Sequence, residues 1–368
     1  MPEVTVARSA CPACGAALTW HPRAQRLGCG YCGTLLPEGT TLVPADAPAG
    51  VVEHDLVAAL RDSTGSARGP GAGTREVKCS NCRAVSVFMD ERVAQRCDFC
   101  GSPAIVAQEA QHDAILPQSL LPIRIDEPRV REVLRQWYGA RWFAPNRLRR
   151  AALTDTLHGV YLPYWTFDAR VRAQWHAEAG YYHYETEPYR DSSGSSATRQ
   201  VRHVRWEPAA GRLEHFFDDE LVPGTAGAHP RLLAGIEPFP TTTDLVPYAP
   251  EYLRGWTVER YRVDLQQAAA RNLDALQAQT RALCAAQVPG DTHRNLQVQA
   301  EFGERRFKHV LVPVWIVAYD YGSRRFQVLV NGYTGRIAGE HPFSWVKIVL
   351  ALLLVAFVVV VIAALQAR

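Results

Sequence analysis

The longest apolar run of the chain lies near its C-terminus, where no residue from Ile348 to Leu365 has a polar side chain. A helix of this length spans about 27 Å, close to the roughly 30 Å of a bilayer's hydrocarbon core. A core helix of a soluble protein usually keeps one polar face, and this segment has none. We therefore predict a transmembrane helix over residues 346–365, with Trp345 and Lys347 at the lipid–water interface.

The position of this helix predicts how the protein is held in the membrane. Few residues follow it, and Met1 to Ala10 lack the apolar stretch of a signal peptide. We expect a tail-anchored, single-pass protein whose N-terminal bulk stays in the cytosol.

Alternating and helical patterns fill residues 113–342, which we predict to be one α+β, strand-rich domain. Val160-Tyr-Leu-Pro-Tyr-Trp165 and Val310-Leu-Val-Pro-Val-Trp315 share the pattern V-x-x-P-x-W, and each continues as a strand. A helix is predicted before each of them, one after Asp126 and one from Leu265 to Ala286. This order makes an internal pseudo-repeat a candidate feature of the domain.

A hairpin with a long polar loop is expected between these two strands. It carries His176, Glu178, His183, Glu185 and Glu187, which could form a metal site or an acid–base site. Such residues on an exposed hairpin are more often solvated than functional, so we expect these side chains to be solvated and not to form a site.

The N-terminal third contains one cysteine pattern twice: C-x-x-C, fourteen residues, then C-x-x-C. Two such pairs can bring four thiolates together as a tetrahedron, which Zn²⁺ accepts at a structural site. We predict zinc ribbons over residues 1–36 and 76–108, each a small β unit with one structural zinc ion, although the spacing also leaves iron open. The predicted ligands are Cys11, Cys14, Cys29, Cys32, Cys79, Cys82, Cys97 and Cys100.

Residues 37–75 are rich in Gly, Pro, Ala and Ser, which indicates a linker, with a short amphipathic helix over 51–61. Matching cysteines of the two ribbons lie 68 residues apart. We therefore expect two autonomous modules, so that loss of one cysteine unfolds only its own ribbon. Arg83 stands where the other turns have glycine, which leaves the geometry of that turn open. The ninth cysteine, Cys284, falls in a helical stretch and is expected to pack in the core.

The net charge of +3 does not favour a general nucleic-acid role. The ribbons are also near neutral, since residues 1–43 hold three Arg against two Glu and residues 74–110 five basic against five acidic residues. One basic patch, residues 141–150, interleaves Arg with Trp and Phe. It could bind phosphates of nucleic acid or of anionic lipids, or be a solvated loop whose aromatic rings pack inward. The candidate phosphate- or lipid-binding residues are Arg141, Arg147, Arg149 and Arg150.

Several sequence patterns typical of enzymes do not occur in the chain: G-x-x-x-x-G-K-[ST], G-x-S-x-G and H-E-x-x-H. Asp218, Asp219 and Glu220 form a carboxylate cluster that could bind Mg²⁺ or act as acid and base. The sequence offers no second cluster of carboxylates that could be placed opposite this one to complete a site. A charged turn is therefore the simpler interpretation. We predict a protein that is not an enzyme.

These features together resemble bacterial membrane-anchored proteins with a TFIIB-type zinc ribbon, some of which are labelled primosomal or helicase-related. The resemblance is carried by the cysteine turns at Cys11 and Cys29, Val160–Trp165, Phe307–Trp315, and Val330-Asn-Gly-Tyr-Thr-Gly335, which runs on to Lys347. It implies no reaction. It implies a place at the bacterial inner membrane, in company with membrane proteins of the SPFH and phage-shock types. The helicase label has no support, because the phosphate-binding lysine motif is absent.

Three hypotheses follow. The leading one is a non-enzymatic, tail-anchored adaptor whose zinc ribbons and α+β domain dock protein partners, in membrane-stress or membrane-organisation complexes. The alternative is a nucleic-acid-binding protein tethered to the membrane. The third is an enzyme with a pocket in the strand-rich domain, lined by His176, Glu178 or the carboxylates of residues 218–220.

Overall fold

The structure is a computed structural model of the 368-residue chain. It describes residues 5–6, 10–38, 40–42, 51–61, 75–88, 96–108, 114–145, 157–190, 196–225, 227–321 and 324–366. Three of the predicted patch residues, Arg147, Arg149 and Arg150, lie outside this set, as does most of the linker predicted after residue 61.

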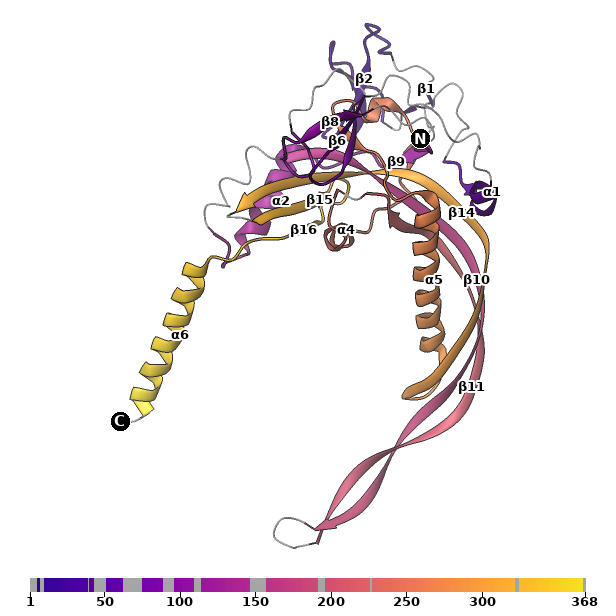
Figure 1. The fold of residues 1–368 in the computed structure, drawn as a ribbon, viewed down its shortest axis with the longest axis vertical. Coiled ribbons are helices and arrows are strands. Elements are labelled where there is room, and N and C mark those ends of the chain that lie inside the picture. Colours follow the sequence, from indigo (N-terminus) through magenta and orange to yellow (C-terminus); the bar gives the residue numbers. More distant parts are fainter. Residues whose placement is uncertain are drawn as a thin grey trace.

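Two long antiparallel strands, β10 (Leu157–Arg190) and β14 (Thr292–Tyr321), run side by side through the molecule and curve strongly (Figure 1). The strand β11 (Ser196–Pro223) pairs with β10, and β15 (Arg324–Asn331) pairs with β14. Buried and exposed residues alternate from Ala169 to Ala177, as expected for a sheet covered on one face.

The helix α5 (Leu265–Gln287) covers this buried face, with Leu276 and Cys284 packed against Trp175 (Figure 1). Its first turn is capped by Asp264, whose carboxylate accepts a hydrogen bond from the amide of Gln267 at 2.8 Å. Cys284 is a core residue, as predicted.

The helix α2 (Glu127–Gly139) follows the sequence prediction closely. Asp126 is its N-cap and accepts from the amide of Arg129 at 3.1 Å. Its buried face, which includes Leu134 and Trp137, packs against β14 and β15.

The two V-x-x-P-x-W segments lie next to each other on β10 and β14. Leu162 pairs with Val312, exactly 150 positions later, and Val160 pairs with Val314. A local two-fold axis therefore passes between Leu162 and Val312, and rotation about it exchanges the segments.

The surroundings of the two segments repeat as well. The strand β13 (Thr257–Glu259) runs parallel to β10 at Val160, and β9 (Ser119–Leu120) runs parallel to β14 at Val310. The indole of Trp165 donates to the carbonyl of Val263 at 2.8 Å, and that of Trp315 donates to the carbonyl of Ile125 at 2.9 Å. Each acceptor directly precedes the aspartate that caps α5 or α2. The domain is thus built from two strand–helix–strand units.

The remaining elements are short. The predicted helix over 51–61 is a strand followed by one and a half turns of helix, because His54–Asp55 pairs with β14 instead. The short elements are β1 (Thr5–Val6), β2 (Leu18–His21), β3 (Arg26–Cys29), β4 (Thr41–Leu42), β5 (His54–Asp55), α1 (Leu56–Arg61), β6 (Arg75–Cys79), β7 (Val85–Phe88), β8 (Ile105–Gln108), α4 (Pro230–Ile236), β12 (Val246–Pro247), η1 (Pro250–Tyr252) and β16 (Ile337–Gly339).

The C-terminal helix α6 (Trp345–Gln366) projects away from the body of the molecule (Figure 1). None of its residues is buried, and it is long and apolar enough to cross a membrane. A strand-rich domain, two four-cysteine clusters and one apolar C-terminal helix agree with the predicted fold class. The helix suggests a membrane anchor.

Candidate metal centres

The four C-x-x-C turns share one backbone conformation. In each, the first cysteine's carbonyl accepts from the amide four residues later, at 2.7 to 3.0 Å. The donating residues are Gly15, Gly33, Arg83 and Gly101, all with positive φ. Arg83 adopts a φ of 64° although it is not glycine, so the second module keeps the same turn geometry. Arg83 in place of glycine therefore does not change the geometry of this turn.

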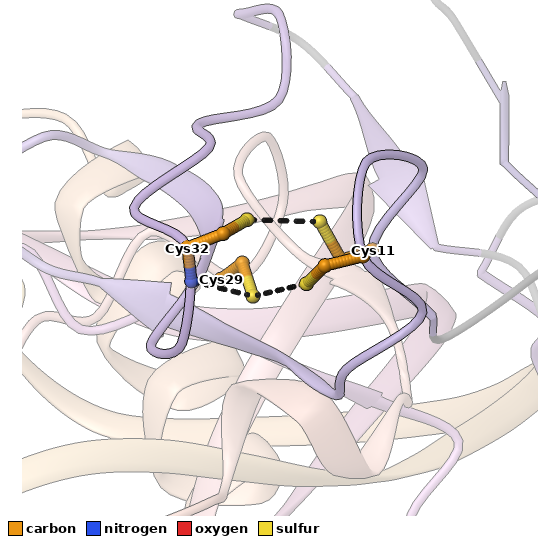
Figure 2. Close-up of side chains that lie close together, drawn as sticks. Cys11, Cys29 and Cys32 are labelled. Atoms are coloured by element: carbon orange, nitrogen blue, oxygen red, sulfur yellow. Dashed lines mark hydrogen bonds between the residues drawn. The ribbon is translucent and has the colours of Figure 1, made fainter.

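The sulfur atoms within each cluster are spaced as a metal requires. Cys11 Sγ lies 3.6 Å from Cys32 Sγ, and Cys14 Sγ lies 3.5 Å from Cys29 Sγ, with the two turns facing each other (Figure 2). A tetrahedral zinc site with Zn–S of about 2.3 Å has sulfur–sulfur distances of roughly 3.8 Å. A disulfide needs about 2.05 Å, so these spacings fit a shared metal ion and not a disulfide.

The second cluster repeats this arrangement. Cys79 Sγ and Cys100 Sγ are 3.6 Å apart, as are Cys82 Sγ and Cys97 Sγ. In both clusters the first cysteine therefore faces the fourth and the second faces the third. The four sulfur atoms of each cluster lie within 4.8 Å of one another, so each can hold a metal ion such as zinc.

Hydrogen-bond donors surround the sulfur atoms, as expected around metal-bound thiolates. The amide of Ala13 points at Cys11 Sγ at 3.4 Å, and the amide of Cys32 points at Cys29 Sγ at 3.5 Å. In the second cluster, the side-chain amide of Asn81 donates to Cys100 Sγ at 3.6 Å. Such donors stabilise negative charge on sulfur and orient the ligands.

The two clusters differ in exposure. Cys14 and Cys32 of the first cluster are exposed, whereas Cys79, Cys97 and Cys100 of the second are buried and Cys82 is half-buried. A bound metal is therefore more accessible to solvent at the first cluster.

The second cysteine module, residues 75–108, is part of the main sheet, and the prediction of an autonomous unit is wrong. Its strand β7 pairs with β13, and a buried ion pair joins Glu76 to Arg260. Phe99, between two of the cysteines, lies in the core with Val160 and Leu162 of β10. Burial of apolar surface across this junction explains why the module does not stand apart.

The first cysteine module, residues 10–36, also packs on the domain. Its Leu18 and Leu27 share a core with Tyr252 and Leu311. The indole of Trp20 donates to the carbonyl of Ile123 at 2.7 Å. A long separation in sequence does not reveal what the apolar faces of the two modules contact, so it is no sign of independence.

The carboxylates at residues 218–220 are not a simple charged turn. Two residues of β11, Asp218 and Asp219, lie opposite Asp168 at a bulge, and the three carboxylates come within 4.8 Å of one another. The amide of Asp219 donates to Asp168 Oδ1 at 2.8 Å. Asp168 lies 50 positions before Asp218 and is not recognisable from the sequence as a member of this cluster.

A buried lysine completes this cluster. Lys308 Nζ lies 2.6 Å from Asp219 Oδ1 and 3.2 Å from Glu53 Oε1. Burial raises the pKa of Asp168 from 3.8 to about 6. Burial also opposes the charged form of Lys308, but its hydrogen bond to Asp219 and the charges of Asp219 and Asp168 outweigh this and raise the lysine's pKa. Since Lys308 already supplies a cation, we interpret the cluster as a structural one.

The histidines and glutamates of the hairpin do not converge on one site. His176 is exposed on β10, and Glu178 is paired with Arg294 on β14 at 2.9 Å. Farther along, His183 lies 3.5 Å from Glu185, and Glu187 lies 3.4 Å from His203. Among the described residues, none of these histidines and glutamates belongs to a group of three metal-ligating side chains.

Of the predicted basic patch, the structure describes residues 141–145. Arg141 lies 3.4 Å above the ring of Trp137 and donates to that residue's carbonyl at 2.6 Å. Trp142 and Phe143 point outward, with 82% and 44% of their surface exposed. The alternative in which these aromatic rings pack inward is therefore wrong.

Comparison with known proteins gives one distant relative, an uncharacterized protein named YdjG from Bacillus subtilis (strain 168). The two chains are 24% identical over 241 residues, which cover 64% of this chain and 66% of the relative. No protein-family model matches the chain. No solved structure matches it either.

Proposed function

We propose that the protein is a non-enzymatic, tail-anchored membrane adaptor of the bacterial inner membrane, with its body in the cytosol and one structural zinc ion in each cysteine cluster. The observation that carries the proposal is α6, an apolar helix of 22 residues, none of which is buried in the body it is attached to. Such a helix is stable in a bilayer, and its exposure to water would be costly.

The zinc ions would have a structural role. Four cysteines fill a tetrahedral coordination shell and leave no position for a substrate. Both modules pack against the sheet, so a metal would stabilise the body of the molecule instead of a separate docking head.

The docking surface we favour is the far end of the β10–β11 hairpin. Pairing with β14 ends at Gly180, and residues 181–190 and 196–206 continue as a two-stranded arm away from the body (Figure 1). Cross-strand pairs brace the arm, for example Arg202 4.4 Å above the ring of Tyr182 and His183 stacked on His203. Tyr184 is 61% exposed and offers the kind of aromatic surface that protein interfaces favour.

The arm gives a direct test of docking. In the variant, residues 183–203 are replaced by Asn-Gly, which closes the shortened hairpin with a tight turn. Full-length protein and variant are cross-linked in bacterial membranes, and the captured proteins are compared with the SPFH and phage-shock types implied by the resemblance. We expect the full chain to capture a membrane-associated protein at least about tenfold more than the variant, at equal zinc content.

Equal capture by both proteins would show that the arm is not the docking surface. Failure of the full chain to capture any specific protein would contradict the adaptor function itself. Zinc content and sedimentation with membranes serve as controls, because the described residues of the arm lie far from the cysteine clusters and from α6 (Figure 1).

Nucleic-acid binding is the second candidate, because the arm carries four arginines, Arg190, Arg199, Arg202 and Arg205, beside exposed tyrosines. Two of them are already paired, Arg199 with Glu187 at 3.5 Å and Arg205 with Glu207 at 3.1 Å. This pairing lowers the charge available to phosphates. Binding of single-stranded RNA or DNA with a steep salt dependence, lost in the shortened-arm variant, would favour this function over the adaptor.

A further inference from the structure

Exposed tryptophans occur at two places in this protein. Of the nine tryptophans, all among the described residues, seven are buried or half-buried, while Trp142 and Trp345 are 82% and 77% exposed. Trp345 begins α6, and Trp142 lies about 200 positions earlier, in the turn after α2. Phenylalanines beside them are exposed as well, Phe343 at 58% and Phe143 at 44%.

Hydrogen bonds hold these two segments together. Lys347 Nζ donates to the carbonyl of Trp142 at 3.0 Å and to that of Ala144 at 2.7 Å. The amide of Ser344 donates to the carbonyl of Phe143 at 2.7 Å. The turn after α2 is therefore hydrogen-bonded to the start of α6, which brings the four exposed aromatic residues to one end of the apolar helix.

The base of this group is rigid. Ala144 and Pro145 are buried, and Arg141 stacks on Trp137, as described above. His341 lies between Trp137 and Phe343, with ring centroids 5.8 and 5.1 Å away. Because the guanidinium of Arg141 is held against Trp137, the exposed groups of this surface are aromatic rings and not the arginine head group.

We propose that Trp142, Phe143, Phe343 and Trp345 form an interfacial collar that inserts into the headgroup region of the bilayer that α6 crosses. The proposal rests on the proposed membrane anchoring and adds a second lipid contact to it. Trp is enriched at membrane interfaces, since its ring is apolar and its N–H remains able to bond water or headgroups. The collar is continuous with the apolar surface of α6, which identifies the bilayer as its occupant.

The collar has a mechanical consequence. A single helix leaves the attached body free to tilt and rotate, whereas a second contact on another segment restricts both motions. The capped helix α2 connects the collar to the sheet, through Trp137 packed near Trp315 and Val328. The collar therefore seats the sheet domain on the membrane surface in a defined orientation.

The test uses the full-length protein in nanodiscs that contain phosphatidylcholine with or without phosphatidylglycerol. Lipids brominated near the headgroup end of the acyl chain quench tryptophans that reach the interface. Three variants are compared with the wild type: Trp142→Phe, Trp345→Phe and, as the control in the first cysteine module, Trp20→Phe. Circular dichroism and zinc content show that each variant folds.

We expect Trp142→Phe and Trp345→Phe each to remove about half of the quenched amplitude, since these are the two exposed tryptophans, and Trp20→Phe to remove none. The same result in both lipid mixtures assigns the contact to aromatic insertion, whereas quenching of Trp142 confined to the anionic mixture would overturn that assignment. If Trp345→Phe removes quenching and Trp142→Phe does not, the proposed collar is wrong, but the proposed membrane anchoring by α6 is still supported. If neither removes quenching, the membrane anchor itself fails.

Discussion

The ammonium group of Lys308 joins three segments that are far apart in the sequence: Glu53 before α1, Asp219 on β11, and its own strand β14. The Lys308 and Asp219 side chains are 6% and 1% exposed. At such a buried pair, removing one partner leaves an uncompensated charge that neither water nor another side chain solvates.

Substitution of Lys308 by Met is expected to lower the free energy of unfolding by about 3–5 kcal/mol, measured by urea denaturation. The matched control is Arg306→Met. Arg306 also lies near Glu53, at 3.4 Å, but its side chain is 60% exposed, and the expected cost is below about 1 kcal/mol. Equal costs for the two substitutions would contradict the interpretation of the cluster as a buried, structural one.

The raised pKa of Asp168 predicts a pH dependence. Its folded-state pKa of about 6 lies above the ordinary value of 3.8, so the folded protein binds this proton more tightly than the unfolded chain. The stability that this group contributes is therefore full at low pH and is lost as pH rises through about 6. Nearby Glu53, Asp219 and Lys308 set the local charge.

Asp168→Asn removes this titration and keeps an oxygen to accept the amide of Asp219. The stability of the variant relative to the wild type should increase by roughly 1–1.5 kcal/mol as pH is raised from 5 to 7.5, in urea titrations. Both proteins carry the same cysteine clusters, so proton uptake by the thiolates cancels in the difference. Asp218→Asn, at an exposed neighbour, controls for the change of charge, and a flat difference for Asp168→Asn would refute the prediction.

The sequence predicted single residues well where the evidence is local. The eight cysteines, the helix after Asp126 and the core position of Cys284 all follow from spacing over a few residues. The place of Asp168 in the carboxylate cluster could not be predicted in this way, because its contact with Asp218 depends on a bulge that shifts the β10–β11 register by one residue. No local pattern in either strand predicts that bulge.

At the scale of elements, the second cysteine module forms one edge of the main sheet through β7 and β13, whereas the first attaches through side-chain packing. Loss of metal should therefore affect the rest of the protein differently at the two sites. Loss of metal from the second, buried module should destabilise the sheet, whereas loss of metal from the first, more exposed module should destabilise it less.

Cys97→Ser is expected to lower the melting temperature of the whole sheet domain by about 10 °C, as reported by near-ultraviolet circular dichroism. Cys97 is buried, and its neighbour Phe99 packs in the central core. Cys14→Ser, at an exposed ligand of the first cluster, should shift that transition by no more than a few degrees. Identical shifts would show that both modules transmit the loss of metal to the sheet equally, which would contradict this prediction.

The difference in exposure also predicts the order of metal release. A zinc-binding dye mixed with the metal-loaded protein should take up one equivalent quickly, from the cluster of Cys14 and Cys32, and a second slowly. Cys14→Ser should abolish the fast phase and leave the slow one. A single phase that releases two equivalents would show that both clusters exchange alike.

In the whole molecule, two strand–helix–strand units form the sheet domain, and the sequence indicated this arrangement only in part. The V-x-x-P-x-W echo is visible in the sequence, and it marks the central pair of strands. A second echo, Ile123-Arg-Ile-Asp126 and Tyr261-Arg-Val-Asp264, could also have been found, since both segments lead from a short strand to a capped helix. The short strands β9 and β13 could not have been predicted from the sequence. They are two and three residues long and are defined by pairing with strands far away in the chain.

The sheet domain, the two cysteine clusters and the projecting α6 underlie our proposal of a cytosolic body on a membrane anchor. The most direct measurement is protease accessibility of the full-length protein in bacterial spheroplasts, followed by sedimentation of the membranes. We expect the body to sediment with the membranes, to stay intact in closed spheroplasts, and to be cut once they are lysed. Recovery of the protein in the soluble fraction, or cleavage of the body in closed spheroplasts, would contradict it.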